Sequence, residues 1–138
     1  MNIDSIKNGV VIDHISAGRA MTLYRLLDLD GLGVPVAIIT NAVSGKKGTK
    51  DIIKIDADID VDLDVIGYVD PGATVSIIKD GLVAEKKKMQ LPKTLKNVLK
   101  CKNPRCITTT EQELPHVFRL TDAESRTYRC IYCETKAT

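Results

Sequence analysis

Four cysteines constrain this chain more than any other feature, because all of them lie in its last 38 residues. Cys101 and Cys106 are separated by four residues, 23 residues follow, and Cys130 and Cys133 are separated by two. Two cysteine pairs on short turns, with a strand hairpin between them, can place four thiolates tetrahedrally around Zn²⁺. The sequence therefore predicts one structural zinc ion per chain, bound by these four cysteines.

The size of this region supports a metal site. A module of about 40 residues buries too little apolar surface to fold alone, and metal binding can supply the missing free energy. A redox dithiol at Cys130-x-x-Cys133 is the rival interpretation, but it lacks the βαβ setting of such sites. Because four thiolates leave no open coordination position, catalysis at the metal is not expected. His116 is interpreted as an ordinary residue of a strand over His116–Thr121, which pairs with Arg126–Cys130.

The first ninety residues alternate between β-rich runs and one helical pattern. The order is β-α-β-β-α-β with one further strand, which is typical of a ferredoxin-like fold. The chain is therefore expected to be α+β, with a ferredoxin-like N-terminal domain followed by a small β-rich four-cysteine zinc domain. The elements expected from these patterns are strands at Val10–Ile15, Val34–Val43, Asp51–Ile55, Ala73–Lys79 and Leu82–Met89, and a helix at Ala17–Leu29.

Residues 55–65 alternate apolar side chains with five aspartates. Strict alternation favours a strand with one acidic face, although aspartate is a poor strand former. Aspartates also suit the N-terminus of a helix, where free N–H groups and the helix dipole favour negative charge. We expect a short helix from about Asp60 to Val69 that ends at Asp70-Pro71-Gly72, followed by a hairpin turn at Asp80-Gly81.

Leu91-Pro92 is the expected boundary between a domain at 1–91 and a domain at 92–138. Eight basic residues and one acid lie between Glu85 and Arg105. Lysines on an edge strand and linker discourage pairing between molecules. A phosphate-binding role for one or two of these lysines is the alternative.

Composition and the absence of certain motifs exclude several functional classes of protein. The net charge is +2, and the aromatic residues are four Tyr and one Phe, too few to suggest a stacking platform for single-stranded nucleic acid. The N-terminus has no apolar signal-peptide region and no segment is long enough to span a bilayer, so the expected compartment is the cytoplasm. Phosphate-loop, dinucleotide and zinc-protease motifs are absent, and the Gly45–Gly48 loop lies in an expected hairpin rather than before a helix. Asp13 and His14 are adjacent on a strand, so they are expected to point to opposite faces and not to form a dyad.

Several motifs together resemble the regulatory chain of aspartate carbamoyltransferase over nearly the whole sequence. Gly9-Val-Val-Ile-Asp-His-Ile15 is similar to one family signature, and Ser44-Gly-x-x-Gly-x-Lys-Asp-Ile-Ile-Lys-Ile55 is similar to a second. The match to the family continues in register at three shorter motifs, Pro71-x-Ala-Thr-Val75, Leu91-Pro92 and Asn97-Val-Leu99. The cysteine spacing is also similar to the family's zinc pattern.

The resemblance implies a non-catalytic subunit that acts in pyrimidine biosynthesis. In this family the N-terminal domain binds nucleotide effectors and pairs with a second regulatory chain, and the zinc domain docks on catalytic trimers. ATP activates, CTP inhibits, and UTP can reinforce CTP.

The resemblance also implies roles for individual residues. Lys54 and Lys86 match positions that hold the triphosphate, Asp13 matches a position near the ribose and base, and His14 lies beside it. Lys50 matches a lysine implicated in a second nucleotide. Further positions expected to contact the nucleotide are Ile6, Val11, Ser76, Ile78 and Val83. Asn103 and Tyr132 match positions that face the catalytic chain.

Three residues depart from the family. Ser76 stands where Asn is common, Gly81 where some members have Tyr, and Thr135 where some have a Lys that contacts the catalytic chain. Two other interpretations remain open at this point. One is a zinc-ribbon module that binds nucleic acid through its basic run, and the other is a small redox protein.

Overall fold

The computed structural model describes residues 6–45, 48–111 and 113–137. It divides into two compact units, Met1–Gln90 (unit 1) and Leu91–Thr138 (unit 2). The expected turn residues Lys46 and Lys47 lie outside the described residues. The mixed α+β class expected from the sequence is confirmed, with more strands than helices.

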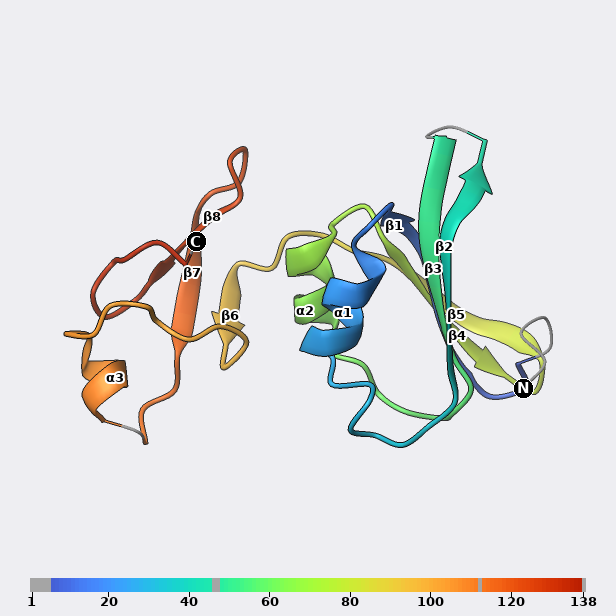
Figure 1. Cartoon of the computed structure of the whole chain (residues 1–138), viewed down its shortest axis with the longest axis horizontal. Helices are drawn as coiled ribbons and strands as arrows, with labels where there is room; N and C mark the ends of the chain where they lie inside the picture. The colour runs from blue at the N-terminus through green and yellow to red at the C-terminus, as the bar shows by residue number, and fades with distance from the viewer. Residues whose placement is uncertain (1–5, 46–47, 112, 138) are drawn as a thin grey trace. The chain divides into compact units, whose positions relative to one another are not determined.

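Unit 1 contains a five-stranded antiparallel sheet with the strand order β2-β3-β1-β4-β5. The first four strands in this order have the ferredoxin-like arrangement, and β5 extends it through the β4–β5 hairpin. Figure 1 shows both helices, α1 and α2, on the same face of the sheet. The elements of unit 1 are β1 (Gly9–Ser16), α1 (Ala20–Leu26), β2 (Val36–Ser44), β3 (Gly48–Ile55), α2 (Leu63–Val69), β4 (Thr74–Lys79) and β5 (Leu82–Lys88).

The two faces of this sheet differ in burial. The helix-covered face carries the core, in which Ile12, Ile15, Ile53 and Ile55 are fully buried. On β3 every second residue from Asp51 is buried, whereas the residues between them are half-buried. Because alternate side chains of a strand point to opposite faces, the half-buried residues line the open face of the sheet.

The acidic run becomes a helix cap and not a strand. The Asp62 side chain accepts hydrogen bonds from the backbone N–H groups of Asp64 (3.0 Å) and Val65 (3.4 Å). Helix α2 begins directly after this cap, three residues later than expected. The helix expected at Ala17–Leu29 is also shorter, because Gly18 has a φ of +92° and Asp28 a φ of +51°, which a helix does not contain.

Unit 2 is a three-stranded antiparallel sheet with one short helix. Its elements are β6 (Thr94–Lys96), α3 (Ile107–Thr110), β7 (Val117–Asp122) and β8 (Thr127–Cys130), and the strand order is β6-β7-β8. Leu95, Phe118 and Tyr128 are fully buried and form a small apolar centre. The sequence did not indicate β6 or α3, because elements of three or four residues are too short to show a periodic pattern.

Candidate effector site and metal centre

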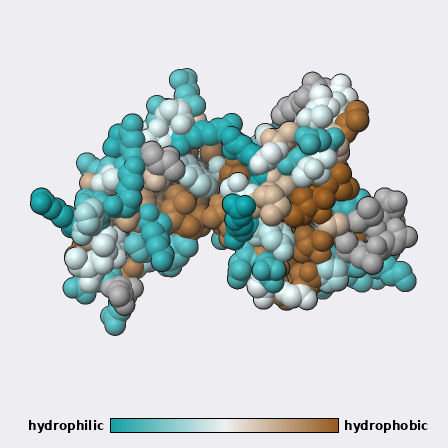
Figure 2. All heavy atoms as spheres, viewed as in Figure 1, coloured by the Kyte–Doolittle hydropathy of each residue, from teal (hydrophilic) through white to brown (hydrophobic). Residues whose placement is uncertain are grey.

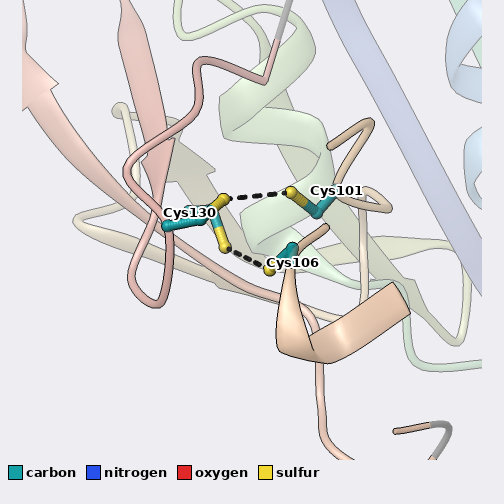
Figure 3. A group of neighbouring side chains, drawn as sticks. Cys101, Cys106 and Cys130 are labelled. Carbon is teal, nitrogen blue, oxygen red and sulfur yellow. Dashed lines mark hydrogen bonds between the residues drawn. The ribbon is translucent and has the colours of Figure 1, made fainter. Parts of the chain in front are cut away.

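The four cysteines converge in unit 2 from two turns. Cys106 is the N-cap residue of α3 and Cys130 ends β8, whereas Cys101 and Cys133 lie in the adjoining loops. Figure 3 shows Cys101, Cys106 and Cys130 directed toward one another. The first turn is shaped by Asn103, whose carbonyl oxygen accepts from the Cys106 N–H at 3.1 Å.

The distances between the sulfur atoms fit a tetrahedral metal site. All four Sγ atoms lie within 4.8 Å of one another. The Sγ–Sγ distance is 3.5 Å for Cys101 and Cys133 and 3.7 Å for Cys106 and Cys130. Four sulfurs at the usual Zn–S distance would be about 3.8 Å apart along each tetrahedral edge. The observed distances are close to this value and far longer than a disulfide bond, and all four cysteines are free.

Burial and hydroxyl contacts shift the pKa values of the four thiols in opposite directions. Burial raises the pKa of Cys101 to about 12 and also raises the pKa of Cys130. A hydrogen bond between Cys106 and the Thr108 hydroxyl lowers the pKa of Cys106, and a hydrogen bond between Cys133 and the Thr135 hydroxyl lowers the pKa of Cys133 to about 6. A bound divalent cation favours the thiolate form of its ligands, so it would offset the cost of ionising Cys101 and Cys130, whose pKa values burial raises.

His116 is not the ordinary strand residue that the sequence suggested. It precedes β7, and its Nδ1 atom accepts a hydrogen bond from the backbone N–H of Cys101 at 3.2 Å. Its own backbone N–H donates to Asn97 Oδ1 at 3.0 Å. The sequence could not indicate this contact, because it joins two loops that only the folded unit brings together.

On the open face of unit 1, four of the expected effector residues form one row. Val11 on β1 lies opposite Lys54 on β3 and Ser76 on β4, and Ser76 lies opposite Lys86 on β5. Residues directly opposite in antiparallel strands share a face. The backbones of the two lysines are three strand spacings apart, about 14 Å. This row therefore places a cationic side chain at each end and small residues between them.

The apolar residues expected near a base extend this row toward one end of the strands. Ile78 lies opposite Gly9 on one side and Val83 on the other. Ile6 is buried, and a side chain at Gly9 would approach Ile6 Cγ2 to 2.7 Å, so Ile6 packs against this glycine. The glycine therefore makes room for Ile6 next to the row.

A β-bulge brings Asp13 and His14 to the same face, so the expectation of opposite faces is wrong. The register of β1 against β3 shifts between Ile12 and Ile15, and His14 has a φ of +58°. This extra residue keeps both isoleucines in the core. His14 Nδ1 lies 3.0 Å from Thr74 Oγ1, and Thr74 is the residue opposite Asp13.

Asp13 also contacts Lys50, whose Nζ atom lies 3.0 Å from Asp13 Oδ1. Partial burial acts to raise the pKa of Asp13, but the hydrogen bonds from Lys50 and from the His14 N–H outweigh burial and lower it. The carboxylate is therefore ionised at neutral pH. It fixes the Lys50 ammonium group at the edge of the open face.

Beside the row lies a cleft of about 550 Å³. His14 and Lys50 line it, whereas Lys54, Ser76 and Lys86 do not, so the expected residues fall into two neighbouring regions. The sequence interpretation missed Lys88 and Thr74, as well as the contribution of the Ser44–Gly45 end of the hairpin. Lys88 belongs to the basic run, Ser44 and Gly45 to the second family signature, and Thr74 to the Pro71–Val75 motif, but only strand pairing brings these segments together. The lining residues are His14, Ile15, Ser16, Val43, Ser44, Gly45, Thr49, Lys50, Gly72, Thr74 and Lys88.

The two residues expected to face a partner differ in their environment. Tyr132 is 42% exposed, and it is adjacent to Ile131, which is 47% exposed. Asn103 is half-buried, and its amide is engaged inside unit 2, where Oδ1 accepts from the Arg105 N–H at 3.0 Å. Its Nδ2 atom donates to Thr135 Oγ1 at 3.5 Å.

The fold and the cluster define a protein in which a ferredoxin-like sheet precedes a four-cysteine metal-binding unit. Residues 1–90 match the model of the aspartate carbamoyltransferase regulatory chain, allosteric domain, and residues 93–138 match that of the metal binding domain of the same chain. The chain belongs to the family of aspartate carbamoyltransferase regulatory chains.

Curated relatives agree with this assignment. A regulatory chain of Clostridium botulinum is 48% identical over 134 residues, which cover 97% of this chain and 92% of the relative. One of Clostridium acetobutylicum is 47% identical with the same coverage, and one of Bifidobacterium longum is 43% identical over 99% of both chains. None of the described helices is long and apolar enough to cross a membrane.

Proposed function

We propose that this chain is the non-catalytic regulatory subunit of a cytoplasmic aspartate carbamoyltransferase in pyrimidine biosynthesis. It binds the nucleotide effectors ATP and CTP, with UTP as a second nucleotide beside CTP, and it alters the activity of catalytic trimers. The observation that carries the proposal is the row from Lys54 through Val11 and Ser76 to Lys86 in a chain of this family.

The chemistry of the row suits a nucleotide. Lysine ammonium groups bind phosphate as point charges, and the half-buried Val11 and Ile78 offer apolar surface to a base. Asp13 is suited to accept hydrogen bonds from ribose hydroxyls or from an exocyclic amine. The adjacent cleft, with Lys50, Lys88 and His14, has room for a second nucleotide.

The metal of unit 2 is proposed to be zinc, because four thiolates at tetrahedral spacing are the donor set of structural zinc sites. Its role is to fold the unit. The exposed residues Ile131 and Tyr132 follow Cys130 directly, so the metal would hold them in place for contact with a catalytic chain. Asn103 is proposed to contribute to the same contact.

A second regulatory chain is proposed to pair with unit 1. Strand β2 lies at one edge of the sheet, and its first four residues, 36–39, are all apolar and all half-buried. Figure 2 shows hydrophobic residues gathered over β2 and β3. An edge strand has backbone groups free to pair with another strand, which favours a homodimer here.

Reconstitution tests the proposal. The chain is mixed with its cognate catalytic trimer, and the aspartate saturation curve is recorded with ATP, with CTP, and with CTP plus UTP. We expect a complex whose half-saturating aspartate concentration shifts with nucleotide, reflecting a coupling free energy of about 1–3 kcal/mol. The isolated trimer is the control and is expected not to respond. Failure to form a complex, or a curve that no nucleotide shifts, would contradict the proposal.

A further inference from the structure

Two threonine hydroxyls contact the cysteine cluster of unit 2. Thr108 Oγ1 lies 3.0 Å from Cys106 Sγ, and Thr135 Oγ1 lies 3.2 Å from Cys133 Sγ. One sulfur of each cysteine pair therefore has a hydroxyl neighbour. Thr108 is 3% exposed, so water does not compete for its hydroxyl.

The surroundings of Thr135 orient its hydroxyl group. The Arg105 N–H donates to Asn103 Oδ1, which turns the Asn103 Nδ2 group toward Thr135 Oγ1. Thr135 Oγ1 accepts from this amide and from the Cys133 thiol, so its own proton is available to the sulfur once that thiol is deprotonated. The Thr135 carbonyl also accepts from the Cys130 N–H at 3.0 Å, which fixes the backbone at the same point. Thr135 thus joins the two cysteine turns.

The direction of these hydrogen bonds depends on the state of the sulfur. In the free thiol, Cys133 Sγ–H donates to Thr135. A metal-bound cysteine has lost this proton and only accepts. Four thiolates carry more negative charge than a divalent cation neutralises, so donors aimed at the sulfurs stabilise the loaded site.

We propose that Thr108 and Thr135 are positioning residues of the metal centre, which donate hydrogen bonds to the thiolates of Cys106 and Cys133 and slow the loss of the metal. This gives Thr135, which departs from the lysine of some relatives, a role inside unit 2. The inference rests on the proposed zinc site.

Zinc transfer from the full-length, zinc-loaded chain to a chromogenic chelator tests this inference. We expect Thr135→Val and Thr108→Val each to release zinc about 10-fold faster than the wild-type chain. Thr110→Val is the matched control, because Thr110 lies on the same helix, is exposed, and donates to the Ile107 carbonyl at 3.2 Å instead of to a sulfur. The control is expected to match the wild type.

Replacing zinc with cobalt gives an absorption spectrum that a change in side-chain packing alone would not shift. Loss of a donor makes a thiolate richer in electrons, so the sulfur-to-cobalt charge-transfer band is expected to shift to longer wavelength in both valine variants. Thr135→Ser and Thr108→Ser keep a hydroxyl group and are expected to restore both the band and the release rate.

The inference is overturned if both valine variants match the wild type in rate and band position, or if the serine variants behave like the valine variants. A wild-type chain that binds neither zinc nor cobalt would overturn the proposed zinc site as well. If the wild-type chain binds a full equivalent of metal but both valine variants keep the wild-type release rate and band position, only this inference is overturned and the proposed zinc site stands.

Discussion

At the scale of single residues, the bulge at His14 determines which polar side chains lie on the open face of unit 1. A regular strand would direct Asp13 and His14 to opposite faces, and it would move Ile15 out of the core. Because His14 adopts a φ of +58°, both isoleucines stay buried and both polar side chains lie near Thr74. The position of Lys50 follows from this, since Asp13 forms an ion pair with it.

The two lysines at the ends of the row are the residues whose replacement should affect nucleotide binding most directly. A hydrogen bond between charged groups contributes about 2 kcal/mol, so Lys54→Ala or Lys86→Ala is expected to weaken CTP or ATP binding roughly 30-fold. Isothermal titration calorimetry of the full chain measures this change. Zinc content is expected to stay the same in both variants.

Lys87→Ala is the matched control for this experiment. Lys87 neighbours Lys86 on β5 but lies opposite Val75, a core residue of the helix-covered side of the sheet. Its loss is expected to leave nucleotide affinity unchanged. Equal affinities for the wild type, Lys54→Ala and Lys86→Ala would refute the roles assigned to the two lysines.

At the scale of elements, one buried carboxylate joins three parts of unit 1. Asp51 on β3 is 1% exposed, and its Oδ2 atom accepts from the N–H groups of Gly18 (2.9 Å) and Ala20 (3.2 Å) at the start of α1. Its Oδ1 atom accepts from the N–H of Asn41 at 3.1 Å, where β2 has its bulge. The carboxylate thus satisfies backbone groups that neither the helix nor the sheet can pair.

Asp51→Asn is expected to destabilise unit 1 by about 3 kcal/mol, because an amide has one acceptor oxygen and turns its NH₂ group toward a buried donor. Urea denaturation of the zinc-loaded chain, followed through the hydrogen exchange of β1 and β3 amides, measures this loss. Asp58→Asn serves as the control, because Asp58 is exposed and its neutralisation should change stability little. If Asp51→Asn lowered the free energy of unfolding as little as Asp58→Asn does, the role given to Asp51 would be contradicted.

At the scale of the whole molecule, the two units depend on different sources of stability. Unit 1 has a continuous core beneath its sheet, whereas unit 2 buries few large apolar side chains, among them Leu95, Phe118 and Tyr128. A structural zinc site contributes about 10–16 kcal/mol of apparent binding free energy, far more than so small a core. Folding of unit 2 is therefore expected to require the metal.

Removal of the metal is expected to unfold unit 2 and leave unit 1 folded, which one hydrogen-exchange experiment can detect. After chelation under reducing conditions, amides of β6, β7 and β8 are expected to lose protection from hydrogen exchange, whereas those of β1 and β3 keep it. Nucleotide binding is expected to persist, and binding to the catalytic chain to disappear. Protected β7 and β8 amides in metal-free protein would show that unit 2 folds without the ion.

Much of the local structure followed from the sequence. The strand runs, the Asp80-Gly81 turn and the cysteine spacing are local patterns, and the structure contains the corresponding elements with shifted ends. Both turn residues have positive φ angles, +52° and +78°, as a tight two-residue hairpin requires. The short elements β6 and α3, the early end of α1 and the bulge at His14 left no local signal, because packing of other segments decides them.

The order of residues along the chain specifies which side chains are present, how far apart they lie in sequence and which family the chain resembles. These suffice for a four-cysteine site, because its ligands lie on two short turns whose spacing is visible in the chain. Folding is needed to bring Lys54, Val11, Ser76 and Lys86 into one row, to place Thr74 and Lys88 along the adjoining cleft, and to bring Thr135 to Cys133. The physical reason is that strand register and bulges depend on contacts between distant segments, which a local pattern does not contain.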